Sequence, residues 1–158
     1  MQDWDAITKH KEFEKTETYG PFLQSFLSIV GGEGGIVHAD FKPEGALAKC
    51  FSAPITEVVT LYFDGGPPDD YLDDVAKLTA KMKKENIQGV VGAAAGITYE
   101  EVEKDGVKGK AAVVLIGWES IDVHMEFRKT DFFKENMGLL RSNAKKITMS
   151  HVKFLESV

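Results

Sequence analysis

The sequence contains a single cysteine, Cys50, among its 158 residues. One thiol cannot form a disulfide within the chain, and a zinc site built from several cysteines is excluded as well. Long apolar runs are also missing, because no segment approaches the roughly 20 apolar residues that a membrane-spanning helix needs. The first twelve residues contain no apolar stretch that could serve as a signal peptide. We therefore expect an intracellular, cytoplasmic protein.

The chain has no long run of basic residues. It contains 19 lysine and arginine residues against 25 aspartate and glutamate residues, and its formal net charge is −6. Nucleic acids and anionic membranes attract basic surfaces, so we expect neither as a partner. Hydrophobic residues make up 43% and charged residues 28% of the chain. This balance is typical of a globular chain with a buried core, and the length corresponds to one domain or slightly more.

An internal repeat is the most informative feature that the chain does contain. Residues 3–19 are echoed by residues 117–133, and residues 38–41 resemble residues 151–154 with the register shifted by one position. The matched pairs are Trp4 and Trp118, Ile7 and Ile121, His10 and His124, Phe13 and Phe127, Lys15 and Lys129, Thr16 and Thr130, His38 and His151, and Phe41 and Phe154. Duplication of one structural unit is the simplest cause of these matches.

The region around the second copy predicts a complete folding unit. Segments rich in β-branched and aromatic residues predict strands, and apolar residues at helical spacing predict helices. The predicted elements are a strand at 55–63, a helix at 71–84, strands at 90–103 and 111–118 joined by a hairpin turn at 104–107, one long helix at 120–144 and a strand at 147–155. This βαββαβ order is that of the ferredoxin-like fold, so the predicted class is α+β.

The first copy contains only the last third of this plan. It predicts a helix over residues 6–30, interrupted at Gly20–Pro21 because proline breaks helices, then a glycine-rich turn at 31–35 and a strand at 36–41. About fifty residues are too few to bury a core alone. We therefore predict a partial repeat over residues 1–50 that packs on a complete domain over residues 54–158, or on another chain.

The segment that joins the predicted strand at 111–118 to the following helix resembles a known family. Trp118, His124, Phe127, Thr130 and Phe133, followed by the final strand at 151–154, look like the fungal antibiotic-biosynthesis-monooxygenase-like (ABM) domains of the dimeric α+β barrel superfamily. The resemblance implies that two ferredoxin-like units pair their sheets into a barrel, with a small-molecule cavity between sheet and helices. Members include cofactor-free oxygenases of polyketide-like phenols, haem-degrading oxygenases, isomerases and proteins without known activity.

Two positions differ from the family pattern. Phe127 stands where many members have a histidine, nine residues after the tryptophan position. Haem-degrading members pair a helix histidine with an asparagine on the first strand, whereas this strand offers Thr56, Glu57 and Thr60. We therefore expect no cofactor. A metal site is not expected either, because no His-x-His or His-x-x-Glu-His spacing is present.

All four histidines belong to the repeat, and each has a structural and a functional interpretation. His124 lies three residues before a buried phenylalanine, where it would either bond to a backbone carbonyl beneath the helix or act as a general base. His151 shares a strand face with Ile147 and Met149, which meets either a core or dimer interface or the cavity. Trp118 would pack as a staple between strand and helix or contact a ligand. The candidate catalytic residues are therefore His124, His151 and Trp118.

Other strand residues leave further alternatives open. Glu57, Tyr62 and Tyr99 are polar residues at positions where a cavity would lie. The small residues of Gly92–Gly96 either leave room for a ligand or allow close packing.

The pattern of the sheet predicts a homodimer. The strands at 55–63 and 111–118 are apolar on both faces, whereas the two helices of one unit cover only one face. A second sheet would cover the other face through a two-fold interface.

Three functions remain open. The first is a cofactor-independent monooxygenase of aromatic or polyketide-type substrates, in which histidine takes a proton from a phenol. The second is a non-catalytic barrel that binds a small apolar or aromatic molecule or serves a stress response, and the third is purely structural association.

Overall fold

The computed structural model describes residues 4–29 and 35–155. Its contacts divide the chain into two compact units, unit 1 (Met1–His38) and unit 2 (Ala39–Val158). The boundary groups residues 39–50, which we predicted to belong to the partial repeat, with the larger unit. Packing of the repeat on unit 2 or on another chain stays a prediction. Within the described residues, no helix combines the length and apolar character needed to cross a membrane.

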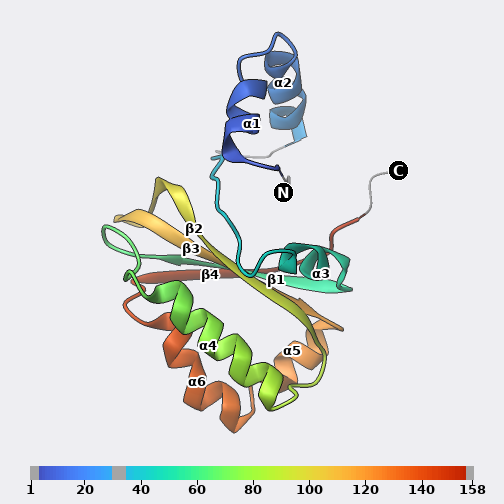
Figure 1. The fold of residues 1–158 in the computed structure, drawn as a ribbon, viewed down its shortest axis with the longest axis vertical. Helices are drawn as coiled ribbons and strands as arrows, with labels where there is room; N and C mark the ends of the chain where they lie inside the picture. The colour runs from blue at the N-terminus through green and yellow to red at the C-terminus, as the bar shows by residue number, and fades with distance from the viewer. Residues whose placement is uncertain (1–3, 30–34, 156–158) are drawn as a thin grey trace. The chain divides into compact units, whose positions relative to one another are not determined.

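Unit 2 has the ferredoxin-like α+β fold that the sequence predicts. Its four-stranded antiparallel sheet has the order β2–β3–β1–β4. The strands are β1 (Ile55–Tyr62), β2 (Val90–Lys104), β3 (Val107–Trp118) and β4 (Lys146–Val152). Helices α4 (Tyr71–Lys84), α5 (Ile121–Phe127) and α6 (Asp131–Arg141) cover one face of this sheet (Figure 1). The predicted hairpin turn is also confirmed, because Asp105 and Gly106 both have positive φ angles, as a tight two-residue turn requires.

The main core lies between the sheet and these three helices. Alternation along β1 directs Val59 and Leu61 toward the helices, where they meet Val75 and Leu78 of α4. Full burial of one such side chain contributes about 1.5–3 kcal/mol. The hydroxyl of Tyr71 donates to the carbonyl of Leu140 at 2.8 Å and so connects α4 with α6. This core holds β1, α5 and β4 in the arrangement on which the candidate site depends.

The prediction of one long helix over residues 120–144 is wrong, because the chain forms two helices, α5 and α6. Thr130 separates them. Its hydroxyl donates to the carbonyl of Phe127 at 2.7 Å and accepts from the backbone N–H of Phe133 at 3.2 Å. A threonine that makes these bonds ends one helix and caps the next, which turns the chain between them.

Unit 1 also contains two helices with a break between them, and the position of this break differs from the prediction. Its helices are α1 (Ile7–Phe13) and α2 (Tyr19–Ile29), so the helix break lies before Gly20–Pro21 rather than at it. Pro21 falls in the first turn of α2, where a missing N–H costs no helical hydrogen bond. The hydroxyl of Thr16 donates to the carbonyl of Phe13 at 2.7 Å, as Thr130 does to Phe127 in unit 2.

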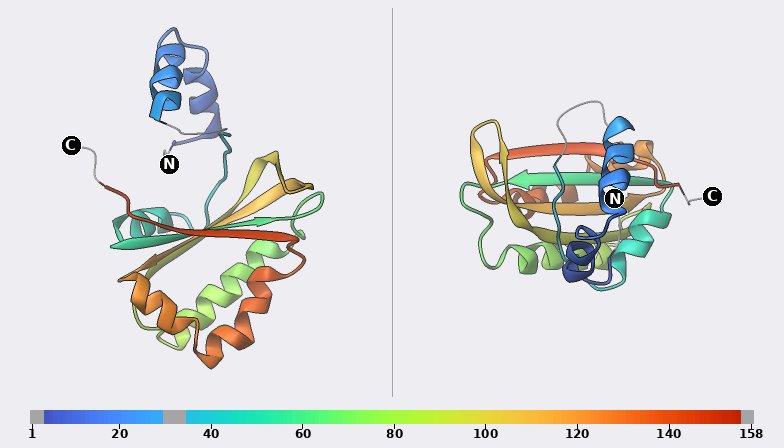
Figure 2. Two further views of the ribbon diagram at one scale, coloured as in Figure 1. Left: turned by 180° about the vertical axis from the view of Figure 1, so that it is seen from behind. Right: turned by 90° about the horizontal axis from the view of Figure 1, so that it is seen from above.

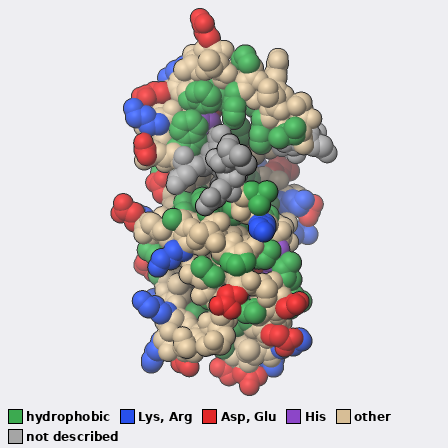
Figure 3. Space-filling model, turned by 90° about the vertical axis from the view of Figure 1, so that its right-hand side faces the viewer, with side chains coloured by type: hydrophobic (Ala, Val, Ile, Leu, Met, Phe, Trp, Pro, Cys, Tyr) green, Lys and Arg blue, Asp and Glu red, His purple; other side chains and the backbone are tan. Residues whose placement is uncertain are grey.

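The last part of the first copy differs from the prediction. Most of the predicted glycine turn at 31–35 lies outside the described residues. No strand forms over residues 36–41; instead Ala39 and Lys42 make isolated bridges with β2. Several apolar side chains of unit 1 are exposed, and the space-filling view shows hydrophobic side chains gathered on this unit (Figure 3). They are Phe26, Leu27, Ile29, Ile36 and Val37.

Helix α3 (Ala46–Ser52) lies on the face of the sheet opposite to α4, α5 and α6 (Figure 2). It buries Cys50 against Val113 and Leu115 of β3. Gly92 permits this close approach, because a Cβ atom there would lie 2.7 Å from the Cβ of Lys49. The prediction that only a partner sheet can cover this face is therefore wrong for its β2–β3 side, which the chain covers by itself.

Candidate active site

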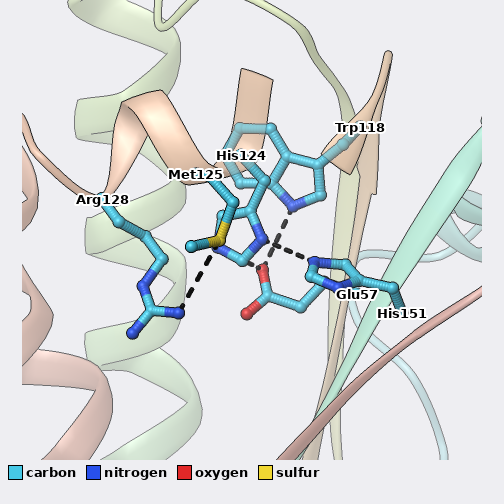
Figure 4. Close-up of polar contacts among 6 residues, drawn as sticks. All are labelled: Glu57, Trp118, His124, Met125, Arg128 and His151. Atoms are coloured by element: carbon cyan, nitrogen blue, oxygen red, sulfur yellow. Dashed lines mark hydrogen bonds and ion pairs between the residues drawn. The ribbon is translucent and has the colours of Figure 1, made fainter. Parts of the chain in front are cut away.

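The structure brings the three predicted site residues together with one acidic residue. Trp118 ends β3, His124 lies in α5, His151 lies in β4, and Glu57 of β1 joins them (Figure 4). Four elements therefore supply one cluster of side chains on the helix-covered face of the sheet, and β1 and β4 lie far in the sequence from the adjoining β3 and α5.

Local structure explains the position of each side chain. The hydroxyl of Ser120 accepts from the backbone N–H of Val123 at 3.2 Å, which caps α5 two residues after β3 ends. The sharp turn places the imidazole of His124 parallel to the indole of Trp118, with ring centroids 4.8 Å apart and planes at 15°. In the sheet, Glu57 is the direct register partner of His151.

The four side chains form a continuous chain of polar contacts. The indole Nε1 of Trp118 donates to Oε2 of Glu57 at 3.1 Å, and Nε2 of His124 lies 3.4 Å from the same oxygen. Nδ1 of His124 lies 2.8 Å from Nε2 of His151. Both ring nitrogens of His124 thus face other side chains, which contradicts the expectation of a bond to a backbone carbonyl. Trp118, His124 and Glu57 are buried, whereas His151 is half-buried.

Burial sets the charges in this cluster. It raises the pKa of Glu57, against the opposing effects of the Trp118 hydrogen bond and the positive charges of Arg128 and Arg141. Burial also lowers the pKa of His124 to about 4, and His151 and Arg128 lower it further. His124 is therefore neutral at pH 7, and the 3.4 Å contact of its Nε2 with Glu57 is not an ion pair between full charges.

Two proton arrangements fit the same atomic positions. With Glu57 ionised, Nε2 of His124 carries the hydrogen and lies 3.4 Å from Oε2 of Glu57, while Nδ1 of His124 accepts from Nε2–H of His151. With Glu57 protonated, the order reverses, and Nδ1–H of His124 donates to His151. Passing from the first arrangement to the second moves one proton from His151 to the buried carboxyl group and leaves His124 neutral, and it balances when His151 starts with hydrogens on both ring nitrogens.

A cavity of about 100 Å³ adjoins the cluster. It is lined by Glu57 and His124, by Arg128 and Arg141, and by apolar side chains from β1, β4 and α6. Small-molecule sites usually enclose about 300–1,000 Å³, so this cavity admits only a small molecule or one edge of a larger one. Arg128, whose guanidinium lies 4.0 Å from the sulfur of Met125 (Figure 4), was missed by the sequence analysis. Among the described residues, no group of three or more His, Cys, Asp and Glu side chains could hold a metal ion.

Unit 1 contains a second cluster of the same composition. The rings of Trp4 and His10 have centroids 4.8 Å apart, and Nδ1 of His10 lies 2.5 Å from Nε2 of His38. The same atoms connect His124 with His151. Glu14 of the same unit approaches Nδ1 of His10 at 3.8 Å, whereas Glu57 approaches Nε2 of His124. The two clusters share their residue types and the histidine contact, whereas the ring planes of tryptophan and histidine meet at 32° in unit 1 and at 15° in unit 2. Duplication of one unit stays a prediction, and the carboxylate from a strand distinguishes the unit 2 cluster.

Acid should weaken the folded state through His124. Its pKa in the folded protein, about 4, lies below the unfolded value of about 6.5, so the unfolded chain binds a proton first as the pH falls. The contribution of the neutral imidazole is complete above pH 6.5 and is lost as the pH falls through about 4, a difference of about 3 kcal/mol. Glu57 acts in the opposite direction, because its raised pKa favours proton uptake by the folded state.

The measurement is therefore a comparison of wild type with His124→Gln. Urea unfolding between pH 7 and pH 4 should show a larger loss of stability in wild type than in the variant. An equal loss in both proteins would show that His124 does not carry the acid sensitivity. A histidine NMR titration of wild type should place the midpoint of His124 near pH 4.

The chain resembles solved structures but matches no family model and no curated protein. An anthrone oxidase-like protein aligns with a TM-score of 0.64 and 13% identity, over 97% of this chain and 69% of that protein. A candidate monooxygenase from Lactobacillus acidophilus aligns with a TM-score of 0.50 and 10% identity, over 94% of this chain and 65% of that protein. A candidate antibiotic-biosynthesis monooxygenase from Bordetella bronchiseptica aligns with a TM-score of 0.46 and 18% identity, over 66% and 99%. At these identities, the likeness to the anthrone oxidase-like protein and to the Lactobacillus acidophilus protein shows the fold alone.

Proposed function

We propose that the protein binds a small aromatic or polyketide-type molecule and acts as a cofactor-independent monooxygenase. The observation that carries this proposal is the cluster of buried Glu57, buried His124 and half-buried His151 beside a cavity. Carboxylates and neutral imidazoles with shifted pKa values are the groups that enzymes use to take protons from weak acids. The neighbour named as anthrone oxidase-like supports an aromatic substrate class.

The proposed reaction needs a base and molecular oxygen. The network takes a proton from an activated C–H or phenolic O–H group, and the resulting anion transfers electrons to oxygen. A ring CH2 group then becomes a carbonyl group: one oxygen atom stays on the carbon, and the other leaves as water with the two hydrogens. A base takes the first proton from the CH2 group, and a second proton leaves the same carbon as the O–O bond breaks and the carbonyl group forms. Glu57 and His124 are the groups that we propose for the first proton transfer.

An oxygen-uptake screen with anthrone-type and phenolic substrates tests this function. We expect uptake that depends on the protein, with formation of the carbonyl product followed by absorbance and mass spectrometry. Absence of uptake with every substrate would contradict the monooxygenase proposal. It would favour the second candidate, a protein that binds an apolar ligand without converting it, for which the apolar side chains that line the cavity beside His124 provide contacts.

We also propose a homodimer that forms through the sheet face opposite to α4, α5 and α6. Helix α3 covers the β2–β3 side of this face, whereas Val58, Thr60 and Tyr62 of β1 are only half-buried there. A second copy could cover them through a two-fold interface. Light scattering should give twice the 17.4 kDa mass of one chain. A mass of one chain at micromolar concentration would contradict the barrel.

A further inference from the structure

Unit 2 contains a larger cavity away from the histidines. Its volume is about 450 Å³, within the range of small-molecule sites. It lies between α4 and β2, and its apolar lining includes Leu72, Ala76, Ala80, Ala93 and Ala95. Neither Glu57 nor any of the three predicted site residues lines it. This cavity is therefore a separate site from the candidate active site.

The segment after unit 1 builds one wall of this cavity. The backbone N–H of Lys42 donates to the carbonyl of Ala95 at 2.8 Å, and its carbonyl accepts from the N–H of Ala95 at 2.9 Å. These two bonds fix residues 42–44 beside the edge of β2. Ala76 and Ala80 of α4 lie across the space, and their short side chains leave it unfilled. A neighbouring space of about 500 Å³ shares five lining residues with it, which are Pro43, Glu44, Thr79, Lys83 and Ala93.

The polar part of the lining carries positive charge. Lys42 and Lys83 line the cavity against a single carboxylate, Glu44, and Lys49 lines the neighbouring space. Within the part of the chain that the structure describes, no ion pair involves any of these three lysines. Unpaired lysines beside an apolar space complement a ligand with an anionic end. The local charge contrasts with the net charge of −6 of the whole chain.

We propose that this cavity binds a small aromatic carboxylate. Its ring lies against the alanines of α4 and β2, and its carboxylate lies near the ammonium groups of Lys42 and Lys83. Burial of the ring supplies most of the affinity, while the lysines select anions over neutral molecules of the same shape. This site does not depend on the proposed monooxygenase function.

Titration of the full chain with 2-naphthoate tests the proposal, with the neutral 2-naphthalenemethanol as a matched probe. Backbone NMR shifts should change saturably at Ala93–Ala95 with naphthoate, and about tenfold more weakly with the alcohol. Ala80→Phe should abolish binding by filling the cavity, and Lys83→Glu should weaken it about tenfold. Lys84→Glu makes the same charge change at an exposed position of α4 outside the lining, and it should leave affinity unchanged.

Several results would overturn this assignment. They are the absence of saturable binding, unchanged binding in Ala80→Phe, or equal affinity for the acid and the alcohol. Circular dichroism checks that each variant is folded. If Ala80→Phe does not fold, Ala76→Leu reduces the same space from the preceding turn of α4. Because oxygen uptake is not the readout, failure of the monooxygenase proposal would leave this test unaffected.

Discussion

Replacing Trp118 with alanine is expected to lower the free energy of unfolding by about 3–5 kcal/mol, the cost typical of deleting a buried tryptophan. Trp118 is fully buried and its ring centroid lies 5.3 Å from that of Phe127. Its loss also leaves Glu57, which is buried, without the indole N–H that it accepts from. An unsatisfied buried acceptor costs about 1–3 kcal/mol. Urea unfolding followed by circular dichroism measures the sum of these effects.

Two further variants separate packing from hydrogen bonding. Trp118→Phe keeps an aromatic ring but removes the N–H, so we expect it to destabilise the protein less than the alanine variant does. Trp4→Ala removes the matching residue of unit 1, which is only half-buried, and its effect should be clearly smaller. Equal losses in Trp4→Ala and Trp118→Ala would contradict the special role that burial gives to Trp118.

The strands and helix α4 could be predicted because their patterns are local. An enrichment in β-branched and aromatic residues predicted β1, and apolar residues at helical spacing predicted α4 with its observed bounds. The break between α5 and α6 could not be predicted this way, because the apolar spacing continues across it. The break depends on the hydroxyl of Thr130, which bonds to backbone groups on both sides. Phe13 and Thr16 match Phe127 and Thr130 in the repeat. This match was a signal for the break that the sequence analysis did not use.

Helix α3 shows a different limit of sequence analysis. Residues 46–52 carry too short an apolar pattern to indicate which surface they cover. Their place on β3 depends on Gly92 and Gly117, which allow the helix backbone to approach the sheet closely. The alternative of close packing at Gly92–Gly96 is therefore confirmed at Gly92, while Ala93–Ala95 of the same run line the proposed ligand cavity.

The candidate site could be predicted in part. The repeat drew attention to His124, His151 and Trp118, and the structure brings these three side chains together. Glu57 was noted only as a polar strand residue, although its alternation with Val59 and Leu61 indicated a side chain that faces the core. Its contact with His124 depends on strand order and register, which a single sequence does not specify.

Under the proposed function, His124→Ala and Glu57→Gln should each slow oxygen uptake by about 10²–10⁴-fold, the usual contribution of general acid–base catalysis. Glu57→Gln keeps an oxygen that can accept from Trp118 but removes the basic carboxylate. His10→Ala is the matched control, because it removes the equivalent histidine from unit 1 and should leave uptake unchanged. Unchanged uptake in His124→Ala would remove His124 from catalysis. Circular dichroism shows whether each variant is folded. His124→Gln is a second variant that removes the imidazole base, so slow uptake in a folded His124→Gln protein shows loss of function rather than loss of fold.

The double variant then tests whether the two residues act together. If a proton passes between Glu57 and His124, either single change interrupts the same path, and the second change should add little. The double variant should therefore be about as slow as the slower single variant. Independent roles would instead give a loss equal to the product of the two single losses. That product would contradict proton transfer through His124 even if each single variant were slow, because it would show two separate contributions to the rate.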